Sequence, residues 1–228
     1  MNTSVNVFLP MRSGSERIKN KNTKKFSGHH GGLASIKIKQ LLNTKMVNSI
    51  YISTDDPLVE SIAKQFASDK INVVRRPDEL ASSAASTDDL VTHAHDIMPN
   101  GHILWTHVTS PFVNSKLYDS IIATYLQNLD SYDSLMTVTK LQKFIWKDNL
   151  PINYCRDREK WPRTQTLEPL WEVNSAAFIA PRNIYKLCKD RIGYSPLLYE
   201  LNQNSAFDID WPGDFKIAEA LFSTKDLY

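Results

Sequence analysis

Six basic side chains and a single acidic one lie between Met11 and Lys25, in a chain that is otherwise nearly neutral. Among them stand the small residues Ser13, Gly14 and Ser15, which would let backbone N–H groups approach an anion while arginine and lysine neutralise its charge. The spacing matches neither a Walker loop nor a dinucleotide-binding glycine motif. The segment therefore indicates a phosphate-binding loop, with a solvated basic turn as the alternative.

Two carboxylates lie near the other end of the chain, at Asp208 and Asp210. On an extended segment, side chains two residues apart point to the same side. Paired carboxylates suit a hard cation such as Mg²⁺, which binds one or two of them together with substrate phosphates. The pair predicts a magnesium site, and a helix N-cap beside an unrelated surface aspartate is the alternative.

The elements that must position these segments alternate between strand and helix. Apolar runs predict strands at Ser4–Pro10, Asn48–Ser53, Ile71–Arg75, His102–Val108, Tyr132–Thr139 and Trp171–Ala180. Apolar spacing and capping residues predict helices at Leu33–Met46, Leu58–Ser68, Ser86–Met98, Leu117–Leu129, Asn183–Asp190 and Gly213–Phe222. This alternation is typical of crossover units around a mainly parallel sheet, in which ligands bind beyond the C-terminal ends of the strands.

The composition is that of an ordinary globular protein. The 228 residues include 42% hydrophobic and 23% charged side chains, with a formal net charge of +2. These values exclude a wholly disordered or collagen-like chain, and the balanced charge argues against binding to nucleic acid or to an anionic membrane. No apolar run reaches the roughly 18–20 residues of a membrane span, and MNTSVNVFLP has no basic leader. With two cysteines as free thiols, a cytoplasmic protein is expected.

The alternation breaks between Lys140 and Pro169. This stretch contains Trp146, Tyr154 and Trp161 among many charges and three prolines, without clean periodicity. Irregular insertions of this length in a compact domain usually serve a function or form an interface. We therefore expect a single domain over residues 1–228 with an inserted arm.

Several short segments, taken together in chain order, resemble one family. They are LPMRSGSERIKNKN, STDD, RRPDELASSAAST, THVTSP, VNSAAFI and FDIDWPGDFKIAEAL. The same order is seen in the acylneuraminate cytidylyltransferases, the CMP-sialic acid synthetases, and the resemblance extends over nearly the whole chain. It implies a three-layer α/β/α sandwich with a mainly parallel, Rossmann-like sheet of the nucleotide-diphospho-sugar transferase type.

The resemblance also implies a reaction in which CTP and a nine-carbon α-keto sugar acid give a CMP-sugar and pyrophosphate. The residues that would be catalytic by position are Arg12, Lys21 and Asp210. Contacts with the nucleotide would come from Arg12, Ser13, Gly14, Ser15, Lys21, Asn22, Arg76 and Ser86. Contacts with the sugar acid would come from His107, Thr109, Ser110, Arg163, Gln165, Asn174 and Phe178. Asp208 and Asp210 would hold Mg²⁺, and the arm at about residues 140–170 would join two copies into a homodimer.

Three residues depart from the usual pattern of that family. Glu16 stands where a lysine is common, His107 where many members have glutamine, and Trp211 where a small residue is usual. His107 indicates a different nonulosonic acid as the substrate. One alternative is an enzyme for an eight-carbon Kdo-type sugar, which the KNKN loop and the paired aspartates disfavour. The other is a nucleotide-binding homologue without turnover, which the retained Arg12, Lys21 and paired aspartates disfavour.

Overall fold

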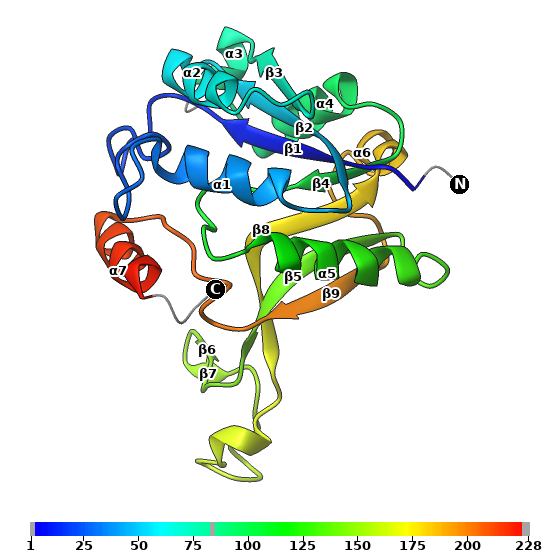
Figure 1. Cartoon of the computed structure of the whole chain (residues 1–228). Helices are drawn as coiled ribbons and strands as arrows, with labels where there is room; N and C mark the ends of the chain where they lie inside the picture. The colour runs from blue at the N-terminus through cyan, green and yellow to red at the C-terminus, as the bar shows by residue number, and fades with distance from the viewer. Residues whose placement is uncertain (1–2, 83–84, 225–228) are drawn as a thin grey trace.

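A seven-stranded sheet forms the centre of the computed structural model, which describes residues 3–82 and 85–224 (Figure 1). Its strands, in spatial order, are β3 (Ile71–Arg75), β2 (Val47–Thr54), β1 (Val5–Met11), β4 (His102–Trp105), β8 (Leu170–Pro181), β5 (Ser134–Leu141) and β9 (Pro196–Leu201). The strands from β3 to β4 are parallel, β8 runs antiparallel to both β4 and β5, and β9 is parallel to β5. The predicted mainly parallel α/β sheet is confirmed.

Helices cover both faces of this sheet. One face packs against α1 (Gly32–Leu42), α2 (Pro57–Gln65), α5 (Ser115–Gln127) and α7 (Pro212–Ser223). The other face packs against α4 (Thr87–Ile97) and α6 (Arg182–Leu187), and the short α3 (Asp78–Ala81) follows β3. Because β1 is central, its side chains are buried on both faces, which explains why its sequence reads as one apolar run.

Two features of the sheet differ from the sequence-based expectation. β4 ends at Trp105, although the apolar run predicted a strand to Val108, because after the hydrogen bond from the Thr106 N–H to the Phe8 carbonyl (3.2 Å) the chain leaves the ladder. β9 was not predicted, since it is an edge strand whose half-exposed side chains carry no clear alternation. The early end of β4 leaves residues 106–111 as a loop at the C-terminal edge of the parallel strands.

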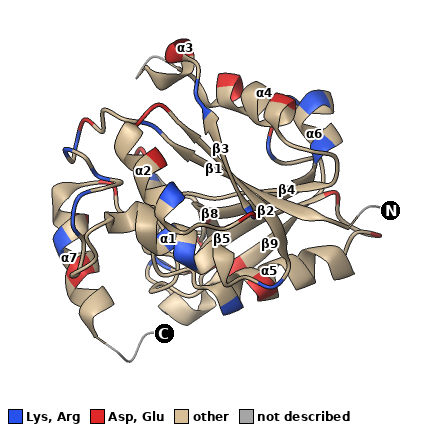
Figure 2. Ribbon diagram, turned by 45° about the horizontal axis from the view of Figure 1, so that its top comes forward, with Lys and Arg blue, Asp and Glu red and all other residues tan. Residues whose placement is uncertain are grey.

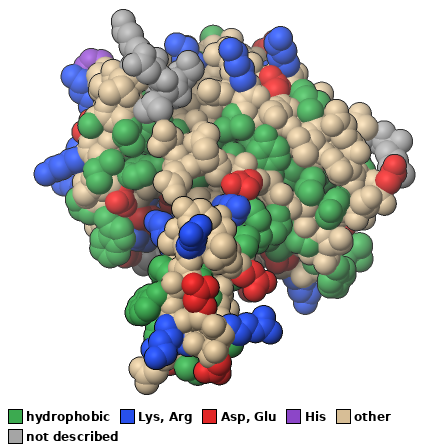
Figure 3. All heavy atoms as spheres, turned by 90° about the horizontal axis from the view of Figure 1, so that it is seen from below, with side chains coloured by type: hydrophobic (Ala, Val, Ile, Leu, Met, Phe, Trp, Pro, Cys, Tyr) green, Lys and Arg blue, Asp and Glu red, His purple; other side chains and the backbone are tan. Residues whose placement is uncertain are grey.

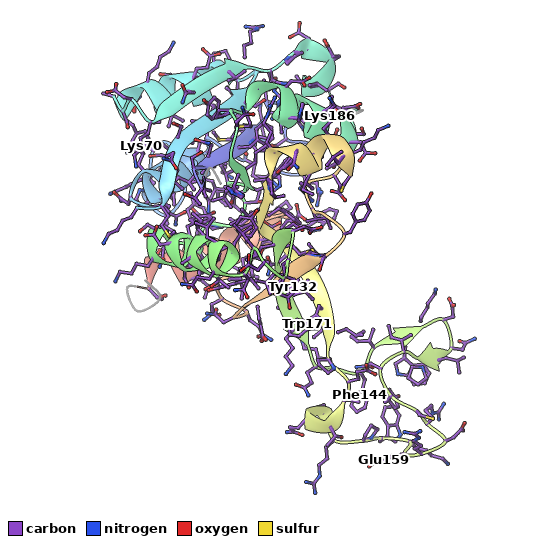
Figure 4. All side chains as sticks on the ribbon, turned by 90° about the vertical axis from the view of Figure 1, so that its right-hand side faces the viewer. Lys70, Tyr132, Phe144, Glu159, Trp171 and Lys186 are labelled. Atoms are coloured by element: carbon purple, nitrogen blue, oxygen red, sulfur yellow. The ribbon has the colours of Figure 1, made fainter. Side chains whose placement is uncertain are left out.

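A segment between β5 and β8, which we call the arm, protrudes from the body (Figures 1 and 4). It contains the paired strands β6 (Trp146–Lys147) and β7 (Leu150–Pro151) and a 3-10 turn at Thr164–Thr166. Phe144 packs edge-to-face on Tyr154 and Trp161, with ring centroids 5.3 and 5.5 Å apart. The buried amide of Asn153 donates to two carbonyls across the arm, at 2.8 and 3.1 Å. The arm is therefore held together by a small cluster of aromatic rings and by the hydrogen bonds of Asn153.

No helix within the described ranges is long and apolar enough to cross a membrane. Cys155 and Cys188 are both free, as expected from their number and spacing. Cys155 is exposed on the arm, and Cys188 lies half-buried just after α6.

Gly32 opens α1 where it packs against the basic loop. Its φ is +58°, and a Cβ atom there would overlap with the carbonyl oxygen of Lys24. We expect Gly32→Ala to lower the free energy of unfolding by about 2 kcal/mol or more, because alanine adds both backbone strain and a clash with the backbone. Urea unfolding of the variant measures this.

The matched control is Gly213→Ala in the first turn of α7, where a Cβ atom would meet no atom within 4 Å. It should leave the free energy of unfolding within about 0.5 kcal/mol of wild type. Equal destabilisation by the two substitutions would contradict this explanation of Gly32.

Candidate active site

A pocket of about 220 Å³ opens at the C-terminal ends of β1 and β4. It is lined on one side by the loop after β1 and on the other by the loop after β4. Its lining residues are Pro10, Arg12, Ser15, Glu16, Arg17, Ile18, Lys21, Asn22, His107, Val108 and Thr109. Figure 2 shows the basic loop beside α7, with lysine and arginine along it. The pocket lies where ligands bind in parallel sheets, and it brings together residues predicted to contact nucleotide and sugar.

The basic loop is held in a fixed shape by its own backbone groups. The Arg12 guanidinium donates to the carbonyl of Gly14 (3.2 Å), whose φ of +66° forms the turn. The Asn22 amide donates to the carbonyl of Arg12 (3.0 Å), while the carbonyl of Asn22 accepts the N–H of Ala34 in α1 (2.8 Å). Asn22 therefore ties both ends of the loop together.

Asp55, whose role was not predicted from the sequence, anchors the middle of the loop. Its carboxylate accepts the Ser13 N–H (2.8 Å) and also the Ser13 hydroxyl. Although partial burial alone would raise the pKa of Asp55, these hydrogen bonds outweigh it and the pKa is lowered. Asp56 is the residue that caps α2, accepting the Leu58 N–H at 2.9 Å. The Thr-Asp-Asp-Pro run therefore combines a helix cap with a loop anchor.

Lys21 connects the basic loop to the acidic segment from the C-terminal part of the chain. Its Nζ donates to the carbonyl of Ile209 (2.9 Å) and lies 3.8 Å from the Asp210 carboxylate. Arg17 approaches the same carboxylate at 3.4 Å, with its guanidinium 4.8 Å from the Trp211 ring centroid. Burial lowers the pKa of Lys21, and the charges of the two aspartates only partly offset this effect.

The second carboxylate, Asp208, is held by the loop after β4. The Ser110 hydroxyl donates a hydrogen bond to the Asp208 carboxylate at 3.4 Å, and the Thr109 side chain also forms a hydrogen bond with this carboxylate. The Ile209 N–H donates to the carbonyl of Thr109 (2.9 Å), which fixes the register of the acidic segment. Burial and the neighbouring Asp210 raise the pKa of Asp208. Thr109 and Ser110, predicted to bind sugar, thus also position a predicted metal ligand.

These residues fit a divalent cation. A carboxylate whose pKa is raised by burial and by a second carboxylate gains most from a nearby positive charge. Among the described residues there is no group of three or more His, Cys, Asp or Glu side chains that could hold a metal ion. The described part of the chain therefore offers Asp208 and Asp210 at this site, and a bound metal would need further oxygen ligands from a substrate, as Mg²⁺ commonly does.

A fully buried lysine forms a hydrogen bond with the backbone of the loop after β4. Lys37 in α1 donates to the carbonyl of Ser110 (2.8 Å) and to the hydroxyl of Tyr118 (2.7 Å). The chain of hydrogen bonds continues from Tyr118 to Thr106 (2.7 Å) and on to the carbonyl of Ala176 (2.6 Å). Burial lowers the pKa of Lys37 to about 7. A charged residue four positions after Leu33, on the apolar stripe of its helix, was the signal in the sequence that could have revealed it.

His107 forms the opposite wall of the pocket from Arg12. Its Nε2 accepts the indole N–H of Trp105 at 3.0 Å. Burial, together with four surrounding cations, lowers the pKa of His107 to about 3. The imidazole is therefore neutral near neutral pH, and its Nδ1 carries the proton.

Arg76 and Ser86, predicted to bind nucleotide, are engaged within the protein. Arg76 is buried and donates to the hydroxyl and the carbonyl of Ser53, at 3.2 and 3.0 Å. Burial lowers its pKa to about 10. Ser86 is the N-cap of α4 and exchanges hydrogen bonds with Asp89. Neither side chain is part of the pocket lining.

The remaining predicted sugar contacts lie outside the pocket lining. Phe178 in β8 is buried beside Trp105. Asn174 is also buried, and its amide donates to Thr139 at 3.0 Å where the pairing of β5 and β8 shifts register. Arg163 and Gln165 are exposed on the arm. The predicted contacts of these four residues with the sugar acid therefore need interactions that this single chain does not make at its pocket.

Residues 7–228 match the cytidylyltransferase family. The chain belongs to this family. Among curated proteins, it is 27% identical to the N-acylneuraminate cytidylyltransferase of Escherichia coli O18:K1:H7 over 240 residues, covering 99% of this chain and 54% of that protein. It is 23% identical to the pseudaminic acid cytidylyltransferase of Campylobacter jejuni subsp. jejuni serotype O:2 over 235 residues, covering 88% of this chain and 98% of that protein. This cytidylyltransferase chain thus spans about half of the first relative and nearly all of the second.

Solved structures share the fold of this cytidylyltransferase chain. CMP:2-keto-3-deoxy-manno-octonic acid synthetase complexed with CTP has a TM-score of 0.68 at 15% identity, covering 98% of this chain and 100% of that chain. A 4-diphosphocytidyl-2C-methyl-D-erythritol synthase has a TM-score of 0.69 at 10% identity, covering 97% and 99%. These likenesses confirm the predicted nucleotidyltransferase type of sheet.

The buried Lys37 predicts a specific dependence of stability on pH. Its pKa of about 7 in the folded chain is below the ordinary 10.5, so above pH 7 the unfolded chain binds more protons at this residue. The free energy of unfolding of the wild type, relative to Lys37→Met, should therefore rise between pH 7 and pH 9, by about 1 kcal/mol or more. Urea unfolding at both pH values measures the difference.

The control is Lys39→Met, which removes an exposed lysine from the same helix. Its stability relative to wild type should not change over this range. If the difference in free energy of unfolding between wild type and Lys37→Met were also independent of pH, Lys37 would keep its proton in the folded chain, which would contradict the prediction.

Proposed function

We propose that this chain couples CTP to a nonulosonic, sialic-acid-like α-keto sugar acid, giving a CMP-sugar and pyrophosphate. The observation that carries the proposal is the convergence of the basic loop, through Lys21, on the paired carboxylates at one edge of the sheet. Support comes from membership of the cytidylyltransferase family and from the names of two relatives, an N-acylneuraminate and a pseudaminic acid cytidylyltransferase.

The reaction joins the anomeric hydroxyl oxygen of the sugar acid to the α-phosphorus of CTP. The bond from this phosphorus to the β-phosphate oxygen breaks, pyrophosphate leaves with the electron pair, and the hydroxyl proton is released. Because such transfers depend mainly on positioning and charge neutralisation, cations around the triphosphate supply most of the catalysis. Arg12 and Lys21, which both line the pocket, would neutralise the phosphate oxygens.

The proposed cofactor is Mg²⁺, with Asp208 and Asp210 as its protein ligands. When bound, it would neutralise phosphate charge and lower the pKa of the attacking hydroxyl. Ser110 and Thr109 orient Asp208 through hydrogen bonds, and Lys21 and Arg17 lie beside Asp210. In this arrangement the protein holds both carboxylates before the triphosphate arrives.

Pyrophosphate release with CTP and Mg²⁺ tests the proposal directly. The panel contains N-acetylneuraminic, legionaminic, pseudaminic and Kdo acids, and we expect release with at least one nine-carbon acid. Release with Kdo alone would assign the chain to the eight-carbon alternative, which the fold of the octonic acid synthetase also accommodates. CTP binding without release from any acid would favour a nucleotide-binding homologue without turnover.

A comparison of substitutions at Lys21 and Lys24 distinguishes a specific phosphate contact from a general effect of the basic loop's charge. Lys21 lines the pocket, whereas Lys24 lies with its Nζ 4.9 Å from the Phe215 ring centroid and outside the pocket lining. We expect Lys21→Ala to reduce kcat/KM for CTP by about 100-fold, because a buried charge-assisted contact is lost. Lys24→Ala should change it less than about threefold, as is usual for a surface charge. Equal losses in steady-state assays would mean that the loop acts only through its overall charge.

We propose, further, that two copies of the chain associate through the arm. Figure 3 shows the arm projecting toward the viewer, with hydrophobic and charged side chains on its surface. Its exposed apolar residues include Leu150 (70% exposed), Trp161 (66%) and Ile152 (50%). Exposed apolar clusters of this kind often mark interfaces. A homodimer would also provide a site for Arg163 and Gln165, which lie outside the pocket of their own chain.

Leu150→Asp tests this association. A carboxylate placed at an apolar interface is left without a partner, so the variant should be monomeric in light scattering at concentrations where the wild type is dimeric. The control is Leu187→Asp on α6, which replaces a leucine that is 69% exposed on the body of the protein. Identical masses for the wild type and both variants would contradict an interface at this part of the arm.

A further inference from the structure

Arg191 lies in the loop between α6 and β9, covering two aromatic rings of the sheet. The carbon of its guanidinium is 3.8 Å from the ring centroid of Phe178 and 5.2 Å from that of Trp105. The side chain is half-buried, and burial lowers the pKa of Arg191. A guanidinium stacked in this way covers its flat face and leaves the N–H donors along its edge free for other contacts.

Those donors have no acceptor in the described part of the chain. No hydrogen bond from the Arg191 guanidinium and no carboxylate within 4.0 Å of it occurs among the described residues. The adjacent Asp190 instead accepts the backbone N–H of Arg191, at 2.6 Å. A partly desolvated cation with five donors is stabilised most by an acceptor oxygen, and best by an anionic one.

Arg191 is not one of the residues that line the pocket, but it is linked to the lining residue His107 through Trp105. Trp105, beneath Arg191, donates its indole N–H to His107, which lines the pocket. Of the four cations that lower the pKa of His107, Arg191 has the largest effect. In the sheet the order is β1, β4, β8, so the path from the basic loop leads first to His107 and then to Arg191 over Phe178.

This order separates the basic side of the pocket from the region at and beyond His107. Arg12, Arg17 and Lys21 surround the part that we assign to the triphosphate. Beyond them stand two donors of a different kind, the neutral His107, whose Nδ1 carries a proton, and the edge of the Arg191 guanidinium. A second reactant that brings its own acceptor oxygens would be recognised here, apart from the phosphates.

We propose that Arg191 extends the sugar-acid site predicted at His107, and that its guanidinium donates to a carboxylate or acylamino oxygen of that substrate. The proposal rests on the proposed function, because the ligand is the second substrate of that reaction. It makes Arg191 a residue that determines which acid is accepted. It also gives a role to a half-buried guanidinium whose N–H donors have no acceptor among the described residues.

The test compares the kinetics of Arg191→Met and Arg191→Lys with those of the wild type. For the acid of the panel that the wild type uses best, Arg191→Met should raise KM by about tenfold or more, since a charge-assisted hydrogen bond is lost. KM for CTP should stay within about twofold of wild type. Arg191→Lys should fall between the two, because lysine retains the charge without the planar pair of donors.

The control is Lys186→Met, which removes a lysine pointing away from the body on α6 (Figure 4). It should leave both KM values unchanged. Thermal melting of all variants distinguishes loss of binding from loss of folding. If Arg191→Met does not fold, Arg191→Lys still has a side chain long enough to cover Phe178, and its kinetics are compared instead.

Two altered substrates identify the oxygen that Arg191 contacts. One is the C1 carboxamide of the accepted acid, and the other carries a hydroxyl in place of its acylamino group. The KM ratio of Arg191→Met to wild type should fall toward one with whichever compound lacks the contacted group. A ratio that persists with both compounds, or a KM for CTP that rises as much as that for the acid, would overturn the proposal. If the wild type releases no pyrophosphate with any acid, the proposed function fails first, before any variant is compared.

Discussion

The hydrogen bond from the Lys21 Nζ to the carbonyl of Ile209, together with the ion pairs of Lys21 and Arg17 with Asp210, joins segments that are about 190 residues apart in the chain. It brings the basic loop after β1 against the acidic segment before α7, and it places a cation beside Asp210 and near Asp208. Neither segment is a site by itself, since one carries excess positive charge and the other a partly buried carboxylate. Their contact is where the proposed function places the triphosphate and the metal.

The surroundings of this contact consist of groups that are already satisfied within the protein. Asp55 anchors Ser13 in the loop, Ser110 holds Asp208, and the buried Lys37 supports Ser110 through its carbonyl. Because these partners are fixed by strands and helices of the core, the charged side chains need little rearrangement on binding. Such preorganisation is the main source of catalysis in phosphoryl-type transfer.

The sequence predicted the elements that depend on local pattern: the alternation of strand and helix, the loop after β1, and the paired carboxylates. It did not reveal β9 as a strand, because the register and edge position of β9 are set by its pairing with β5. Lys37, Asp55 and Arg191 were not identified either, since each acts through neighbours that are distant in sequence. The resemblance placed Phe178 in the sugar pocket, whereas the structure buries it beneath Arg191. Residue types and their spacing could not show that the Arg191 side chain covers the Phe178 ring.

The central claim is that triphosphate and metal are bound together at the junction of the two segments. Calorimetric titration of CTP, with and without Mg²⁺, into the wild type and Asp210→Ala tests it most directly. The account predicts that Mg²⁺ strengthens CTP binding to the wild type by about tenfold or more, as expected when a metal bridges carboxylates and phosphates, and that Asp210→Ala loses most of this gain. An equal effect of Mg²⁺ on both proteins, or none on the wild type, would contradict it.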